Sequence, residues 1–425
     1  MICIKLLIHI LRIAVAIFLL IVLVCAMIAV GRAAYSRELA YQAVSTGERQ
    51  PAERAIALAP SDPEAYLAQA VSLLNSGDFE QAYQTYERAI TLRPHDYQLW
   101  FRLGYAHYFA GDVVGAIQPF KEAVQRAPYY AEPRWMLGKV LLAAGQREEA
   151  FVELKGAMSS NPVYAPDVIG FAWEAYGGNT EAIERVINPQ SPSERLILAL
   201  SFVSHEKIEE AMRTIRPQDM SERDRRDFVV ALLNEGQFAQ AYSVWSNGKA
   251  APDLINNGSF EDTISRDKQE FGWQFTHARV EQLRFSRDSG SPHQGKLSLR
   301  IDFNGIGNAS MNLVSTLVVV QPKSNYRLTW WARSKDLATG GLPIVGINDA
   351  SNDDQPLAES TTLASGTSDW QNYSMEFSTG TTTNGIYINL RRKLCSAGCP
   401  VTGHLWLDDF SLQKLEPTNL NLPAR

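Results

Sequence analysis

The stretch LWFRLGYAHYFAGDVVGAIQPFKEAVQRAP, from Leu99 to Pro128, decides the fold of the middle of the chain because its landmark residues recur. A glycine, two alanines and a proline each return at an interval of 34 residues. The recurring sets are Gly77, Gly111 and Gly145, then Ala82, Ala116 and Ala150, then Ala89, Ala123 and Ala157, then Pro94, Pro128 and Pro162. Glycine lets the backbone leave one helix and enter the next, and proline ends a helix. The period predicts a solenoid of helix-turn-helix units.

Three consecutive segments with this pattern resemble the tetratricopeptide repeat family. They read AYLAQAVSLLNSGDFEQAYQTYERAITLRP, LWFRLGYAHYFAGDVVGAIQPFKEAVQRAP and PRWMLGKVLLAAGQREEAFVELKGAMSSNP, and the clear repeats run from Pro63 to Pro162. Gln69 and Arg134 depart from the family pattern, since a leucine and an aromatic residue are usual there. Similar helical phrases before and after these units extend the expected solenoid over residues 36–250, with degenerate repeats in 163–250.

The resemblance implies that the first helix of each pair lines an inner groove that binds a protein partner. The side chains implied there are Glu64, Leu67, Val71, Leu74, Gln98, Phe101, Tyr105, Tyr108, Glu132, Trp135, Lys139 and Leu142. The candidate contact residues are Phe101, Tyr105, Tyr108, Trp135 and Lys139, because aromatic side chains are typical anchors of interfaces. Aromatic residues at helical spacing also serve solenoid packing, and that interpretation stays open.

The last part of the chain changes to short β-branched and aromatic runs between turn residues, which predicts a β-sandwich over residues 253–415 and a tail at 416–425. In YRLTWWAR the period of two puts Tyr326, Leu328, Trp330 and Ala332 on one face and Arg327, Thr329, Trp331 and Arg333 on the other. The arginines mark the solvent face, so Trp331 is expected there. Trp330, Trp370 and Trp406 are expected in the core.

Several phrases from Leu254 to Leu415 resemble carbohydrate-binding modules of the galactose-binding-like jelly-roll type, such as those of xylanases and glucanases. In order they are LINNGSFED, FGW, GKLSLRIDF, NYRLTWWARS, SDWQNYSMEF and GHLWLDDFSL. The resemblance implies a concave sheet face that binds a polysaccharide. Our candidates for it, from the outer face of two strands, are Trp331, Arg333, Tyr387, Asn389 and Arg391. A plain solvated sheet surface is the alternative.

The same resemblance implies a structural calcium ion. Its ligands would be Glu261, in the NGSFE phrase, and Asp409, in the last strand, beside Asp408. Calcium prefers oxygen ligands, and backbone carbonyls near residues 293–296 would complete the shell. The alternative is a hydrogen-bonded carboxylate pair at the edge of the sandwich.

The first residues, 1–31, read as a membrane anchor. Ile13–Val30 contains no charge and, as a helix, would span roughly 27 Å, near the thickness of a bilayer core. A cleaved secretory signal is the main alternative, because Ala29-Val30-Gly31 is a tolerable cleavage site, and a buried core helix is another. The expected fold is therefore a transmembrane helix, an all-α superhelical solenoid and an all-β jelly roll.

Cys395 and Cys399 lie in the segment CSAGC without other Cys or His companions. A zinc site needs about four ligands, so we interpret the pair as a local disulfide, which implies an oxidising compartment. This favours a cytoplasmic N-terminus with the bulk of the chain outside, periplasmic or extracellular. Two free cysteines would give the same sequence.

The 425 residues carry 40 Lys and Arg against 46 Asp and Glu, a net charge of -6, so no basic excess suggests nucleic-acid binding. The chain lacks a GxSxG motif, and its histidines show no spacing typical of metal ligands. We therefore expect a non-catalytic, membrane-anchored adaptor that binds a protein partner and a glycan, with a role in exopolysaccharide or cell-envelope assembly. The alternatives are a jelly roll that packs on the solenoid without binding sugar, and a glycan-processing enzyme with an unrecognised site.

Overall fold

The computed structural model of the chain describes residues 2–249, 254–264, 270–275, 283–305, 312–393 and 400–416. Its elements form two compact units, Met1–Gln190 and Ser191–Arg425. The described part contains fourteen α-helices followed by two antiparallel β-sheets. This order confirms the predicted fold class, an α-solenoid followed by a jelly-roll sandwich.

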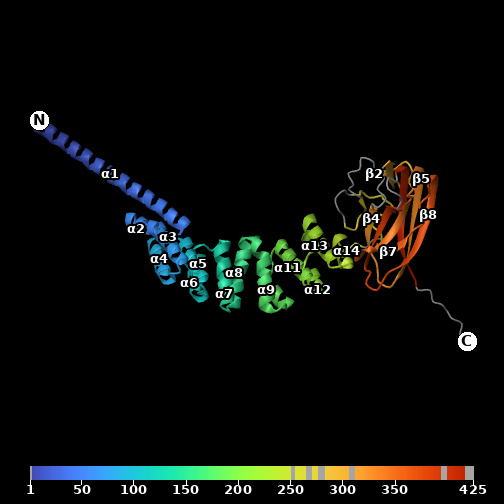
Figure 1. Ribbon diagram of the computed structural model, residues 1–425, viewed down its shortest axis with the longest axis horizontal. Coiled ribbons are helices and arrows are strands. Elements are labelled where there is room, and N and C mark those ends of the chain that lie inside the picture. Colours follow the sequence, from blue (N-terminus) through green and yellow to red (C-terminus); the bar gives the residue numbers. More distant parts are fainter. Residues whose placement is uncertain are drawn as a thin grey trace. The chain divides into compact units, whose positions relative to one another are not determined.

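The first unit begins with α1 (Ile2–Thr46), a single helix that contains both the apolar segment and the first helix of the array. Its C-terminal half packs on the repeats: Ser36 Oγ donates to the Ala55 carbonyl at 2.8 Å, and Arg37 Nε lies 3.0 Å from Asp62 Oδ2. Its N-terminal half extends beyond the repeats as a rod (Figure 1). By length and composition, α1 could cross a membrane or belong to a signal sequence.

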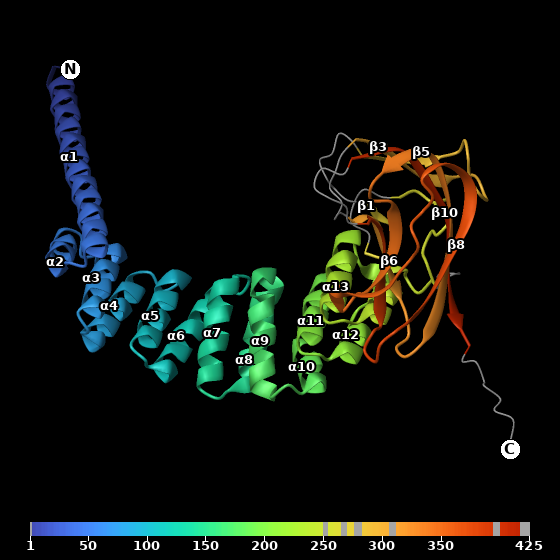
Figure 2. The same cartoon turned by 45° about the vertical axis from the view of Figure 1, so that its right-hand side comes forward.

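Stacked antiparallel helices form the rest of the first unit (Figure 2). They are α2 (Arg49–Leu58), α3 (Pro63–Asn75), α4 (Phe79–Leu92), α5 (Tyr97–Phe109), α6 (Val113–Arg126), α7 (Ala131–Ala143), α8 (Arg147–Ser160), α9 (Ala165–Tyr176) and α10 (Thr180–Ile187).

The recurring residues have the structural roles that their spacing predicts. The repeated glycines have positive φ angles, +82° at Gly111, where other residues are strained. The repeated alanines are completely buried between helices, and Gly104 lies so close to the ring of Phe120 that a Cβ would come within 2.8 Å of it. Each repeated proline follows the end of a second helix by two residues, as Pro128 follows α6.

The second unit begins with α11 (Pro192–Ser204), α12 (Ile208–Thr214), α13 (Glu222–Asn234) and α14 (Phe238–Trp245). Ser191 starts α11 with a capping box: its Oγ accepts from the Glu194 N–H, and the Glu194 side chain accepts from the Ser191 N–H. Gly236, with φ +68°, makes the turn between α13 and α14, and Ala241 is fully buried. The spacing of this glycine and alanine repeats the pattern of the first unit.

Two five-stranded antiparallel sheets complete the second unit. Sheet I has the order β1-β4-β9-β6-β7, and sheet II has the order β2-β3-β10-β5-β8. The strands of sheet I are β1 (Gln274–Phe275), β4 (Asn312–Val319), β9 (Gly385–Arg392), β6 (Pro343–Asp349) and β7 (Asn352–Glu359). Those of sheet II are β2 (Leu283–Asp288), β3 (Ser298–Asn304), β10 (Val401–Leu415), β5 (Asn325–Thr339) and β8 (Gly366–Ser378).

The core of the sandwich lies between the two sheets, and strand β5 shows how the sequence builds it. Tyr326, Leu328 and Trp330 are at most 1% exposed and belong to the core cluster. Arg327 and Trp331, at alternate positions of the strand, point to the outer face and are at least partly exposed. The expected alternation along this strand is therefore confirmed.

Helix α14 packs against sheet I. The ring of Phe238 lies over Gly385, where a Cβ would come within 2.8 Å of it. Phe271 is 1% exposed and contacts both Tyr242 and Trp245, with ring centroids 5.1 Å and 5.7 Å away. The last helix and the sandwich thus share an aromatic interface inside one compact unit.

Candidate functional site

Strand β9, at the centre of sheet I, presents a row of polar side chains on its outer face. Ile386, Ile388 and Leu390 point into the core cluster. By the period of two, Tyr387, Asn389 and Arg391 point the other way, and the structure therefore places these three predicted residues together. The row is flanked on both sides by neighbouring strands, so it forms the middle of the sheet face.

The neighbours of Asn389 make this face polar. Asn389 is 5% exposed, and its Nδ2 donates to Asn348 Oδ1 at 3.0 Å across to β6. In the strand register Asn389 lies opposite Gly346 on β6 and Ser315 on β4. Amide and hydroxyl groups can each donate and accept hydrogen bonds, as ligands rich in hydroxyl groups require.

Gly346 has no side chain, and the guanidinium group of Arg391 occupies the space above it. A Cβ at Gly346 would come within 3.3 Å of Arg391 Nε. Arg391 also forms an ion pair with Glu359 on β7. Its Nε is buried and has no hydrogen-bond partner among the described residues.

Trp331 and Arg333 do not belong to this face, which corrects the expectation that all five candidates share one surface. Both lie on β5, which is part of sheet II, whereas β9 is part of sheet I. The two groups therefore lie on opposite outer faces of the sandwich. Strand pairing between distant segments decides which face a residue joins, and the local sequence pattern does not contain that information.

On sheet II, an aromatic cluster surrounds Trp331. The His293 ring stacks on its indole at a centroid distance of 3.8 Å, and Trp370 meets His293 edge-on at 5.7 Å. One face of the Trp331 ring is thus already covered by a protein side chain. Trp370 is only partly buried here, so the expectation that it lies in the core is wrong.

Trp406 is 5% exposed but points away from the core, which corrects our expectation for it as well. The guanidinium groups of Arg300 and Arg333 lie 5.2 Å and 5.5 Å from its ring centroid. Its Nε1 donates to Asp288 Oδ2 at 2.6 Å, and this hydrogen bond is the main cause that lowers the pKa of Asp288. Two cationic side chains, not the core, therefore bury this tryptophan.

The predicted calcium ligands converge on the loop that carries His293. Glu261 Oε1 accepts from the Lys296 and Leu297 N–H groups at 2.6 Å and 3.0 Å, which lowers the pKa of Glu261. The carboxylate Oδ2 of Asp409 lies 2.6 Å from His293 Nδ1. Both candidate ligands thus hold one short loop against the sandwich.

Asp408, next to this pair, is fully buried. Its carboxylate accepts from the His293 and Asp409 N–H groups at 2.9 Å and 2.8 Å. Burial raises the pKa of Asp408 to about 6, and the Asp409 charge adds to the effect. Carboxylate oxygens suit a calcium ion in donor chemistry. The described residues contain no group of three or more Asp, Glu, His or Cys placed to hold a metal, so backbone carbonyls would have to contribute.

In the first unit, the five groove candidates lie on α5 and α7. Phe101 and Tyr105 line a cavity of about 420 Å³ that also includes side chains of α3. The Lys139 ammonium lies 5.6 Å from the Tyr108 ring centroid and 5.9 Å from that of Trp135. Tyr105 is 49% exposed. The structure thus forms two adjoining aromatic sites along these helices.

Part of the aromatic content serves packing. Phe101, Tyr108 and Trp135 contact the buried cluster between α6 and α7. Trp135 also stacks on Tyr164 at 4.7 Å. These side chains therefore combine structural contacts with partial exposure.

The predicted disulfide partners, Cys395 and Cys399, lie outside the described residues.

Two family models match segments of the chain. Residues 67–131 match a tetratricopeptide repeat model, and residues 252–395 match a carbohydrate binding domain model. No curated protein matches the sequence.

Solved structures resemble parts of the chain. A structure of CBM4 is 14% identical, with 38% of this chain and 99% of that one covered and a TM-score of 0.29. MamA from Desulfovibrio magneticus RS-1 is 19% identical over 37% of this chain and 94% of its own, with a TM-score of 0.32. The Pseudomonas aeruginosa protein pilF is 15% identical over 52% and 99%, with a TM-score of 0.33. The family models thus mark residues 67–131 as similar to tetratricopeptide repeats and residues 252–395 as similar to carbohydrate binding domains, and both kinds of domain are non-catalytic.

Proposed function

We propose that this protein is a non-catalytic adaptor that binds a glycan on the outer face of sheet I and a protein partner in the groove of its repeats. The polar row Tyr387, Asn389 and Arg391 on β9 carries the first half of the proposal. This row combines an aromatic ring with amide and guanidinium donors on the central strand, and the guanidinium group lies over Gly346. The matching carbohydrate-binding model supports the same conclusion.

A glycan array probed with the full chain tests this half. We expect binding to at least one polysaccharide that falls about tenfold or more in the Tyr387→Ala and Arg391→Ala variants, because each removes a side chain from the face. Thr329→Ala, on the outer face of sheet II, is the matched control and should bind like the wild type. Loss of binding in Trp331→Ala but not in Tyr387→Ala would instead place the glycan on sheet II.

The adaptor proposal includes a structural role for calcium. Glu261 and Asp409 would hold the ion, and carbonyls of the loop that carries His293 would complete its coordination. The convergence of both carboxylates on that loop supports this assignment. When bound, the ion would add a fixed positive charge beside Asp408 and pin the loop to the last strand.

In the first unit, the partly exposed aromatic side chains along α5 and α7 support the protein-binding half. An extended peptide would contact Tyr105 in the cavity of α3 and α5, and Lys139 with Tyr108 as a second place. Helix α1 would hold this adaptor at a membrane, with the N-terminus in the cytoplasm and both units outside. A role in exopolysaccharide or envelope assembly follows from the combination of an anchor, a protein groove and a glycan module.

A second candidate function, structural packing of the jelly roll on the helical array, is favoured by one observation. Phe238 packs on Gly385 at the start of β9, so α14 already covers the end of the sheet I face. If the folded full chain bound no plant, microbial or envelope polysaccharide on the array, this structural function would replace glycan binding.

A further inference from the structure

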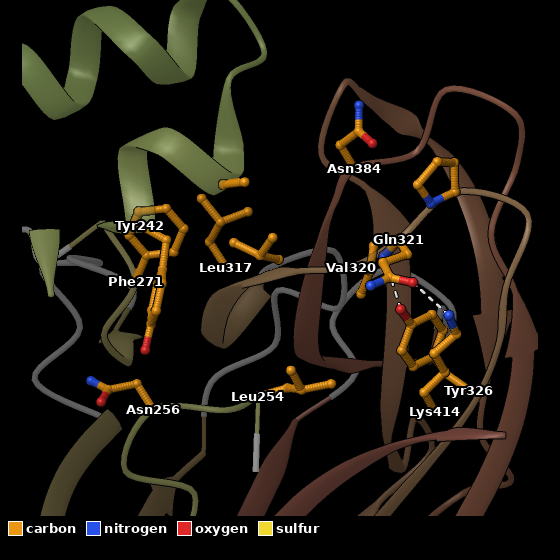
Figure 3. Close-up of a pocket in the computed structure, with 13 residues that line it drawn as sticks. Tyr242, Leu254, Asn256, Phe271, Leu317, Val320, Gln321, Tyr326, Asn384 and Lys414 are labelled. Atoms are coloured by element: carbon orange, nitrogen blue, oxygen red, sulfur yellow. Dashed lines mark hydrogen bonds between the residues drawn. The ribbon is translucent and has the colours of Figure 1, made fainter. Parts of the chain in front are cut away.

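A cavity of about 600 Å³ lies beside α14 in the second unit, and neither half of the proposed function uses it (Figure 3). Separate segments of the chain meet there: Tyr242 comes from α14, Phe271 from the segment before β1, and Leu317 from β4. Its volume lies in the range of small-molecule sites, which is roughly 300 to 1,000 Å³.

The walls of this cavity are mainly apolar. The rings of Tyr242 and Phe271 form one side, and Leu317 and Val320 line another (Figure 3). Leu254 also lines the cavity and is 41% exposed, which is high for a leucine. A ligand with an apolar body would remove this surface from water.

One end of the cavity is polar and positively charged. Lys414 is the single ionisable cation among its lining residues, and its Nζ donates to Gln321 Oε1 at 2.5 Å. The backbone N–H of Gln321 donates to the Tyr326 hydroxyl at 2.8 Å, which fixes the position of Gln321. In the described part of the chain, no carboxylate forms an ion pair with Lys414. The ammonium is thus held by Gln321 at the solvent-exposed end of the cavity.

We propose that this cavity binds an amphipathic anion, a molecule with an aliphatic chain and one carboxylate or phosphate group. The chain would lie against Tyr242, Phe271 and Leu317, and the anionic group would pair with Lys414 in a charge-assisted hydrogen bond. Aliphatic and aromatic side chains supply most of the lining, beside the amides of Asn256, Gln321 and Asn384, so an apolar body suits this cavity. Fatty acids and lipid phosphates share the required chemistry.

The test uses the full chain in phosphatidylcholine nanodiscs and the fluorescent probe dansylundecanoic acid, with empty nanodiscs as the blank. Saturable binding above the blank is expected. Lys414→Gln should weaken it about tenfold, because the charged hydrogen bond is lost. Lys335→Gln, an exposed lysine on β5 outside the cavity, is the matched control and should leave the affinity unchanged.

A second variant tests the cavity itself. Ala239 lines it from the exposed side of α14, so Ala239→Trp should fill the space and abolish binding while the unfolding temperature stays the same. Displacement of the probe by decanoate or by dodecyl phosphate identifies which anion is preferred. Absence of saturable binding, undiminished binding in Ala239→Trp, or equal affinity of Lys414→Gln and wild type would each overturn the proposal.

Discussion

His293 stacks on the indole ring of Trp331 with centroids 3.8 Å apart and an interplanar angle of 17°. The imidazole belongs to a loop and the indole to the middle of β5, so this contact closes the loop over sheet II. His293 is held a second time by Asp409, whose Oδ2 lies 2.6 Å from Nδ1. The pair joins the aromatic cluster to the candidate metal ligands.

Replacement of His293 by alanine should destabilise the sandwich by about 1 kcal/mol or more, because an aromatic pair of this geometry is worth about 0.5–1.5 kcal/mol beyond area burial. Urea unfolding followed by tryptophan fluorescence measures the effect. Thr402→Ala, at an exposed position of β10, serves as the control. An unchanged unfolding midpoint in His293→Ala would show that the loop does not depend on the stack.

The hydrogen bond from Trp406 to Asp288 predicts a pH-dependent contribution to stability. The pKa of Asp288 is lower in the folded state, chiefly because of the indole N–H. This contribution is therefore present above the unfolded pKa of about 3.9 and is lost as the pH falls through the folded pKa. Trp406→Phe removes the donor and keeps a ring between Arg300 and Arg333.

We expect the difference in unfolding free energy between wild type and Trp406→Phe to be larger at pH 7 than at pH values below the folded pKa of Asp288. Carboxyl NMR titration should show the Asp288 pKa rising in the variant. A stability difference that is constant with pH would mean that only packing, not the hydrogen bond, was lost.

Three glycines of the helical array separate backbone effects from packing effects. Gly111→Ala should cost about 1 kcal/mol, because φ is +82° and the space around it is empty. Gly104→Ala should cost about 1–3 kcal/mol, because the new Cβ would meet Phe120. Gly170→Ala, inside α9 with open space around it, should stabilise by about 0.5–1 kcal/mol.

Thermal unfolding of the full chain, followed by far-ultraviolet circular dichroism, ranks these three variants. Gly111→Asn should be milder than Gly111→Ala, since asparagine tolerates the left-handed region better. Equal effects at Gly111 and Gly170 would contradict the role given to the turn.

Local periodicity made the solenoid and strand β5 predictable from the sequence. The interval of 34 residues located the turns of Gly77, Gly111 and Gly145, and alternation separated Trp330 from Trp331. Each turn of the repeat and the alternation along β5 are set within a few residues of chain, where backbone geometry decides which face a side chain joins.

Long-range pairing made the rest unpredictable. The sequence does not show that β5 and β9 join different sheets, so it predicts one face for Trp331 and Asn389, which the structure separates. Trp406 is expected in the core, yet Arg300 and Arg333 cover it on the outer face. Nor did any local signal indicate that Phe271 would dock on α14, because that contact depends on the packed tertiary structure.

Calcium should raise the unfolding temperature of the sandwich. A ligand that binds only the folded state stabilises that state by about 2.7 kcal/mol when its concentration is about 100 times the Kd. A chelator should reverse this stabilisation. Glu261→Gln and Asp409→Asn should abolish the response. Asp262→Asn, next to Glu261 in sequence, is the control and should keep it. Equal responses in all four proteins, or none in the wild type, would contradict the assignment of the site.

The compartment of the two units can be tested at Cys395 and Cys399. If they form a disulfide outside the cytoplasm, an impermeant maleimide should label intact cells only after reduction, because disulfides persist in oxidising compartments. A background with Cys3 and Cys25 replaced by serine and alanine removes the other thiols. Labelling that requires permeabilisation would place both units in the cytoplasm and reverse the proposed topology. Labelling of intact cells without reductant would agree with the proposed topology but would show two free thiols. In a Cys395→Ser variant the remaining Cys399 has no partner, so its labelling would confirm that the reagent reaches this segment.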